Sequence, residues 1–295
     1  MKKSNLVFSI CLLALLMPFN LKTSSQQNTQ SKPREKGSVV FDIPGTDNVI
    51  VKKDIRYQSV TGSALTMDIY YPPNFDFKSK IPVVIIVLGY PDMAGQRLLG
   101  SKFKNYITFI SWCKIIAASG MAAIVYESVN PGQDILALSN YLKSNEIELG
   151  IDNSKIGAFT LSAHSPTTIN EVLTGPGNIF KCAVVYYGFF LTNDFINLPQ
   201  IDVISQDMGF NTPRLPDPAS WKKDVPIMIV RAGIDNVPYI NQSLADFYEK
   251  ALSQNLPIIL VNYSNGTHGF DTSIDDDLTR QIIKNTLEFW KFNLK

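Results

Sequence analysis

The sequence predicts an α/β fold, a doubly wound and mostly parallel sheet with antiparallel strands at its N-terminal end. Short apolar runs typical of strands alternate with stretches whose apolar residues recur at helical spacing. The strand-like runs are nearly continuous in valine and isoleucine, which indicates strands covered on both faces. The two earliest runs are joined only by a turn at Gly62, which predicts an antiparallel hairpin at the start.

The elements follow in order along the chain. The expected strands span residues 49–60, 64–71, 81–88, 121–126, 155–160, 182–187, 226–231 and 257–263. Helical spacing is clearest in residues 240–252 and in the last segment, where Asp275, Asp276 and Asp277 suit the positive end of a helix dipole. Residues 191–224 are rich in Pro, Asn and Asp and form either a short lid or a plain connecting loop.

The first 25 residues have the features of a secretory signal peptide. Lys2 and Lys3 precede an apolar run, residues 6–19, that is too short for a membrane span. Thr23 and Ser25 are the small residues expected at positions −3 and −1 of a cleavage site. We therefore expect a periplasmic or secreted protein with no stable membrane insertion after processing. An uncleaved anchor and lipidation of Cys11 remain the alternatives.

After the signal, residues 26–40 are expected to form a polar linker and residues 41–295 a single domain. The chain is 45% hydrophobic with a formal net charge of +1 and no block of like charge, which argues against nucleic-acid binding. The sequence has no metal-ligand cluster, and we expect no metal and no cofactor. Cys113 and Cys182 lie in apolar stretches and are expected as buried thiols, with a disulfide as the alternative. The sequence does not predict an oligomeric state.

The segment KIGAFTLSAHSPTTIN runs from an expected strand through Ser162 into an expected helix. This is the arrangement of a nucleophile elbow, usually written G-x-S-x-G, with Thr160 and His164 at the two glycine positions. Thr160 suits a strand end, and Pro166 is tolerated in a first helical turn. The substitutions therefore put the activity in question rather than the fold.

Only two histidines are available as a base for Ser162. His164 lies two residues away at a helix start, and neighbours two apart on a helix do not face each other, so we expect it to line the pocket. His268 lies in the glycine-flanked loop SNGTHGFD after the last strand and is the candidate base. Asp235, just beyond the strand ending in MIVRAG, is the candidate acid that orients the imidazole.

An oxyanion intermediate needs preorganised N–H donors. The expected donors are the backbone amides of Ala163, after the nucleophile, and Tyr90, in the LGYPD loop after the third strand. Phe189 and Phe190, at the start of the long loop, are candidate pocket walls. Glu127, at the end of the fourth strand, is a further pocket candidate.

The residue order Ser162, Asp235, His268 is that of α/β-hydrolases. The chain resembles that superfamily, in its dienelactone-hydrolase-like or small-esterase branch. The segment SVTGSALTMDIYYPP resembles the opening hairpin of the superfamily, and PVVIIVLGYPD resembles its oxyanion strand, with Leu88 where many members have His. The resemblance implies a secreted serine hydrolase that cleaves a small carboxylic ester or lactone. The alternative is a catalytically inactive binding protein of the cell envelope with the same fold.

Overall fold

The computed structural model describes residues 34–192 and 212–295. The expected signal peptide, most of the expected linker and much of the long irregular segment lie outside these residues. Eight strands form one sheet in the order β1-β2-β4-β3-β5-β6-β7-β8. The strands are β1 (Ile50–Gln58), β2 (Ala64–Tyr71), β3 (Ile81–Ile86), β4 (Ala122–Tyr126), β5 (Ile151–Leu161), β6 (Cys182–Tyr186), β7 (Ile227–Ala232) and β8 (Ile258–Tyr263).

The predicted sheet is confirmed in type and direction. β1 pairs antiparallel with β2, and β2 pairs antiparallel with β4. All other neighbouring strands are parallel. β5 begins at Ile151, four residues before the expected start, because Ile151 already pairs with Ile81 ahead of a register shift.

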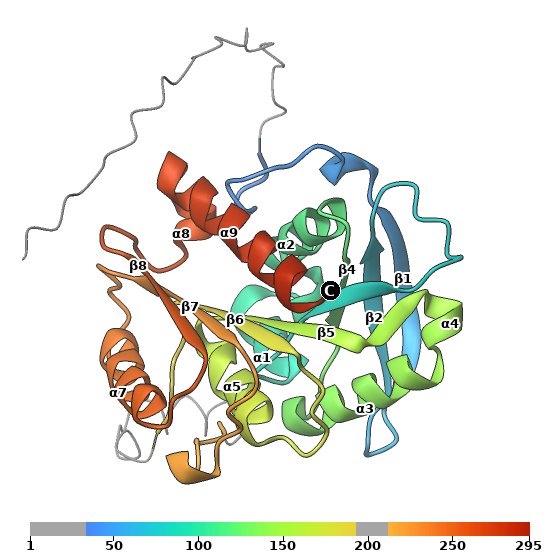
Figure 1. The fold of residues 1–295 in the computed structure, drawn as a ribbon. Helices are drawn as coiled ribbons and strands as arrows, with labels where there is room; N and C mark the ends of the chain where they lie inside the picture. The colour runs from blue at the N-terminus through green and yellow to red at the C-terminus, as the bar shows by residue number, and fades with distance from the viewer. Residues whose placement is uncertain (1–33, 193–211) are drawn as a thin grey trace, which may run out of the picture. The chain divides into compact units, whose positions relative to one another are not determined.

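Helices cover both faces of this sheet. The α-helices are α1 (Asp92–Leu99), α2 (Ile107–Ala118), α3 (Pro131–Ser144), α4 (Glu146–Leu149), α5 (Ser165–Thr174), α7 (Ile240–Ser253), α8 (Phe270–Ser273) and α9 (Asp277–Asn293). Figure 1 shows α2 and α9 on one side of the sheet and α3, α5 and α7 on the other. Within the described ranges, no helix has the length and apolar character needed to cross a membrane.

Aromatic side chains join the sheet to α2 and α9. The Trp112 ring lies 4.5 Å from that of Phe159 on β5 and 6.4 Å from that of Trp290 on α9, measured between centroids, and all three side chains are fully buried. Edge-to-face packing of this kind adds stability beyond the buried area. Of the three acids expected in the first turn of the last helix, only Asp277 lies within α9, while Asp276 caps the helix by accepting the Thr279 N–H at 2.7 Å.

The domain begins earlier than the sequence indicated. Val39 and Val40 were expected in the linker, but both are buried. The Val40 N–H donates to the Asp271 carbonyl at 2.7 Å, and the Val39 N–H donates to the Ser111 hydroxyl at 3.0 Å. A short apolar segment inside a polar stretch carries little periodicity, so its docking depends on contacts that are distant in sequence. Cys113 and Cys182 are buried free thiols.

Candidate functional site

Three parallel strands deliver three polar side chains to the same edge of the sheet. Ser162 directly follows β5, Asp235 follows β7, and His268 follows β8. Ser162 has φ 51°, in the left-handed region that a non-glycine residue rarely adopts. The strained turn joins β5 to the short helical turn Ser162–His164 and then to α5, which begins at Ser165. This is the strand–turn–helix geometry of a nucleophile elbow.

The three side chains form a continuous hydrogen-bonded chain. Ser162 Oγ lies 2.8 Å from His268 Nε2, and His268 Nδ1 lies 2.8 Å from Asp235 Oδ2. The Asp235 carboxylate is fully buried, and its other oxygen accepts the Val237 N–H at 2.9 Å. A carboxylate at Nδ1 favours the tautomer with the proton on that nitrogen, which leaves Nε2 to accept the serine proton.

Gly233 allows the Asp235 and His268 loops to touch. A Cβ on Gly233 would lie 2.2 Å from the Ser264 carbonyl oxygen, so only glycine fits there. The Gly233 N–H donates to the Tyr263 carbonyl at 2.8 Å, and the Ile234 N–H donates to the Gly266 carbonyl at 3.0 Å. These backbone bonds hold the loop after β7 against the loop after β8, which brings the acid to the imidazole.

The missing elbow glycines are accommodated in two ways. Thr160 is fully buried in β5, where it pairs with Val185 of β6. The backbone of His164 packs against Gly89, where an added Cβ would lie only 2.5 Å from His164 Cα. The close contact between the elbow and the loop after β3 is therefore made possible by Gly89 in that loop. The elbow position itself can then have a large side chain.

A cavity of about 520 Å³ opens beside Ser162. Its described walls include both expected oxyanion donors, Tyr90 and Ala163, together with His164, which was predicted to line the pocket. None of the described lining residues is an Asp, Glu, Lys or Arg. Leu98 and Leu99 of α1 line the cavity while remaining 62% and 45% exposed, so the rim is apolar as well.

A buried acid near the base was missed by the sequence reasoning. Asp271, in the HGFD segment, accepts the Tyr187 hydroxyl at 2.7 Å and the Trp112 Nε1–H at 2.8 Å. Burial raises the pKa of Asp271 above the usual range of a carboxyl group. Tyr187 has φ 35°, and its ring centroid lies 4.6 Å from that of His268. Asp271 therefore fixes the tyrosine that packs on the imidazole. The feature of the sequence that could have identified Asp271 is its position three residues after His268.

Three expected pocket residues are not among the described residues that line this cavity. Phe190 is buried in the core, and its ring stacks on that of Phe247 of α7 at 4.4 Å between centroids. Phe189 contributes its backbone carbonyl, which accepts the Ser165 hydroxyl at 3.0 Å. Glu127 is separated from β5 because β3 lies between β4 and β5 in the sheet. Its carboxylate pairs instead with Lys102 Nζ at 2.8 Å.

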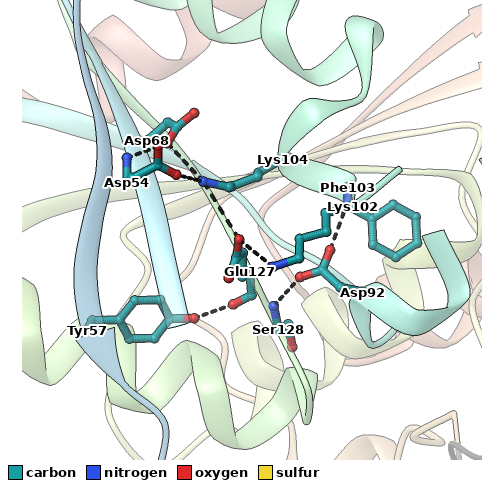
Figure 2. A network of polar contacts seen from close by, with 9 residues as sticks. All are labelled: Asp54, Tyr57, Asp68, Asp92, Lys102, Phe103, Lys104, Glu127 and Ser128. Carbon is teal, nitrogen blue, oxygen red and sulfur yellow. Dashed lines mark hydrogen bonds and ion pairs between the residues drawn. The ribbon is translucent and has the colours of Figure 1, made fainter. Parts of the chain in front are cut away.

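Glu127 belongs to a polar network that includes the residues on either side of Phe103 (Figure 2). Buried Lys104 contacts Asp54, and its Nζ lies 3.3 Å from Asp68 and 3.7 Å from Glu127. Lys102 and Lys104 flank Phe103, whose ring forms part of the cavity wall. Because both neighbours are tied to acids from β1, β2 and the end of β4, the position of Phe103 is well determined.

Asp92, the first residue of α1, strengthens this attachment. One carboxylate oxygen accepts the Phe103 N–H at 2.8 Å and the other accepts the Ser128 N–H at 2.8 Å (Figure 2). Burial raises the pKa of Asp92, while the two backbone donors lower it. The carboxylate thus joins two segments that line the cavity, α1 and the turn at Phe103, to the loop after β4.

Comparison with known proteins agrees with this architecture. No protein-family model and no curated protein sequence matches the chain. Among solved structures, a fungal esterase from Rhizomucor miehei superposes with a TM-score of 0.62 at 13% identity, covering 83% of this chain and 84% of the esterase. A bacterial heroin esterase gives a TM-score of 0.61 at 14% identity, covering 87% of each chain.

A third solved structure is larger than this chain. Dipeptidyl peptidase 4 from Porphyromonas gingivalis gives a TM-score of 0.62 at 17% identity, covering 84% of this chain but only 36% of the peptidase. At these identities the similarity establishes the fold. The chain has the α/β-hydrolase fold, as predicted.

Proposed function

We propose that this protein is a serine hydrolase that cleaves a small, uncharged carboxylic ester or lactone through an acyl-enzyme on Ser162. The observation that carries the proposal is the chain of two 2.8 Å contacts from Ser162 through His268 to Asp235. A strained serine at a strand end beside a cavity is the second support. The esterases among the structural neighbours agree with this activity.

The reaction follows from the positions of these groups. Ser162 Oγ attacks the ester carbonyl carbon while His268 Nε2 accepts the hydroxyl proton, and Asp235 stabilises the resulting imidazolium. The backbone N–H groups of Tyr90 and Ala163 stabilise the oxyanion. Collapse of the tetrahedral intermediate expels the alkoxide, which takes the proton from His268. Water, deprotonated by His268, then attacks the acyl-enzyme and releases the acid and free Ser162.

The cavity lining favours a neutral substrate. A peptide bound by its amino terminus carries an ammonium group, and an ammonium group bound away from water needs a carboxylate partner. The described residues around the cavity supply none, whereas Leu98, Leu99 and Phe103 offer apolar contact. We therefore favour an ester with an apolar acyl or alcohol group over a peptide substrate.

A matched pair of substrates tests this choice. p-Nitrophenyl heptanoate and p-nitrophenyl 6-ammoniohexanoate share a leaving group and an acyl chain of the same length, and they differ only in a terminal methyl against a terminal ammonium group. We expect hydrolysis of the neutral ester, with kcat/KM at least about 10-fold lower for the charged ester because its ammonium group loses water without gaining a carboxylate partner among the described lining residues. Equal rates would contradict a neutral pocket. Hydrolysis of neither ester would favour the non-catalytic binding protein.

We also propose that the protein is exported and loses residues 1–25, which lie outside the described residues. The support is the sequence alone, namely the Lys2-Lys3 start, the short apolar run and the small residues Thr23 and Ser25. The intact mass of the exported protein is expected to match a chain that begins at Gln26. A mass that retains Met1, or that includes lipid on Cys11, would contradict this processing.

A further inference from the structure

Side chains from β4 and from the elbow region hold the loop that follows β3. Backbone pairing with β5 continues to Val87, whose N–H donates to the Phe159 carbonyl at 2.9 Å. At the next residue the Leu88 N–H donates to the Tyr126 hydroxyl at 3.2 Å. The Gly89 N–H then donates to His164 Nδ1 at 2.8 Å. Side-chain acceptors thus replace the backbone hydrogen bonds of the sheet for two further residues.

Gly89 makes such support necessary. Its close approach to the His164 backbone excludes any larger residue, as described above. Glycine leaves the adjoining peptides more conformational freedom than any other residue. The peptide between Gly89 and Tyr90 contains the N–H assigned to the oxyanion, so this freedom lies next to the group that must be preorganised.

A second contact acts on that same peptide. The Thr167 hydroxyl donates to the Gly89 carbonyl oxygen at 3.4 Å. In a trans peptide the C=O and the following N–H point in opposite directions. A carbonyl held toward α5 by Thr167 therefore directs the Tyr90 N–H away from that helix. His164 fixes the peptide before Gly89, and Thr167 fixes the peptide after it.

The surroundings of His164 suit a neutral acceptor. Its ring has aromatic neighbours at centroid distances of 4.7 Å for Phe103, 5.5 Å for Phe109 and 5.8 Å for Tyr90. Burial lowers the pKa of His164 to about 4, so the imidazole is neutral at pH 7. Since Nδ1 accepts the Gly89 N–H, the ring proton lies on Nε2.

We propose that His164 is a positioning residue, whose Nδ1 accepts the Gly89 N–H and, together with Thr167, holds the Tyr90 N–H in place for the oxyanion. This role goes beyond lining the pocket, and it rests on the proposed hydrolase activity. It also accounts for a large polar residue at an elbow position where glycine is usual. The side chain of His164, at the position where the motif has glycine, thus stabilises the loop in which Gly89 leaves room for the His164 backbone.

Two substitutions of His164 separate its role as a hydrogen-bond acceptor from its role as part of the cavity wall. His164→Phe fills the aromatic site but has no acceptor, and it is expected to lower kcat for p-nitrophenyl butyrate about 10²-fold with little change in KM. This is the scale of losing one oxyanion donor. His164→Asn keeps an acceptor near the position of Nδ1 and is expected to recover most of kcat. Its loss of ring contacts is expected to raise KM.

Adjacent threonines of α5 provide a matched control. Thr167→Val removes the donor to the Gly89 carbonyl and is expected to lower kcat by up to about 10-fold. The Thr168 hydroxyl donates to the His164 carbonyl at 3.2 Å rather than to the loop, so Thr168→Val is expected to leave kcat unchanged. Thermal unfolding of every variant identifies changes caused by loss of the fold.

A spectroscopic measurement tests the hydrogen bond without relying on activity. The chain has only two histidines, so ¹⁵N-histidine labelling gives two ring systems, and His164→Asn identifies one of them. We expect His164 in the wild type to be neutral at pH 6, with its proton on Nε2. A ring protonated on Nδ1 at that pH would overturn the proposal, as would wild-type kcat in His164→Phe. Wild-type protein that hydrolyses no ester would instead contradict the proposed function, and the spectrum would still report on His164.

Discussion

Replacing Ser162 with alanine is expected to lower kcat for ester hydrolysis by up to about 10⁶-fold, the scale known for loss of a triad nucleophile. The physical reason is that no other hydroxyl in the described structure is shown in contact with His268 Nε2. The change removes one oxygen from a half-buried side chain, so the melting temperature is expected to change little. Steady-state kinetics with p-nitrophenyl butyrate and thermal unfolding measure the two quantities.

Ser165 provides the control for Ser162. It lies three residues away, but its hydroxyl donates to the carbonyls of Ser162 and Phe189. Ser165→Ala is therefore expected to lower stability, because two half-buried carbonyls lose a donor, and to leave most of kcat intact. If Ser165→Ala abolishes turnover while Ser162→Ala retains it, Ser162 is not the nucleophile.

Replacing Asp235 with asparagine is expected to lower kcat by up to about 10⁴-fold while KM changes little. An amide at this position can donate to Nδ1, which favours the tautomer with the proton on Nε2. That tautomer cannot accept the Ser162 proton. Because the Asp235 carboxylate is fully buried and hydrogen-bonded to Val237, the variant keeps the shape of the site. Kinetics at fixed pH measure the loss.

Two other acids serve as controls. Asp271→Asn is expected to lower stability through its bonds to Tyr187 and Trp112, with a much smaller effect on kcat than Asp235→Asn. Glu127→Gln is expected to disturb the pairing with Lys102 and to leave the imidazole tautomer unchanged. If either variant loses more kcat than Asp235→Asn, a different carboxylate orients His268.

The sequence was sufficient to predict the strands and the residues at their carboxyl ends. Parallel strands covered on both faces have long apolar runs, and functional residues lie just beyond the carboxyl ends of those runs. Ser162, Asp235 and His268 are each within five residues of a strand end, so their convergence followed from the topology. The strand order, which places β3 between β4 and β5, was needed to show that Glu127 lies elsewhere.

Contacts between positions far apart in the chain could not be predicted from the sequence. Phe190 at a loop start has the same pattern whether it lines a pocket or, as here, stacks on Phe247. The packing of Gly89 against His164 joins residues that are 75 positions apart. The space for His164 at the elbow position therefore comes from Gly89, and no local sequence motif relates these two residues.

Covalent labelling by a fluorophosphonate probe, followed by intact-mass analysis and peptide mapping, tests the hydrolase proposal most directly. A serine activated by His268 reacts with such a probe, whereas an ordinary pocket serine does not. We expect a single adduct, located on Ser162 in the wild type and lost in Ser162→Ala and His268→Ala. Absence of an adduct on well-folded wild-type protein, or an adduct at a serine other than Ser162, would contradict the assignment.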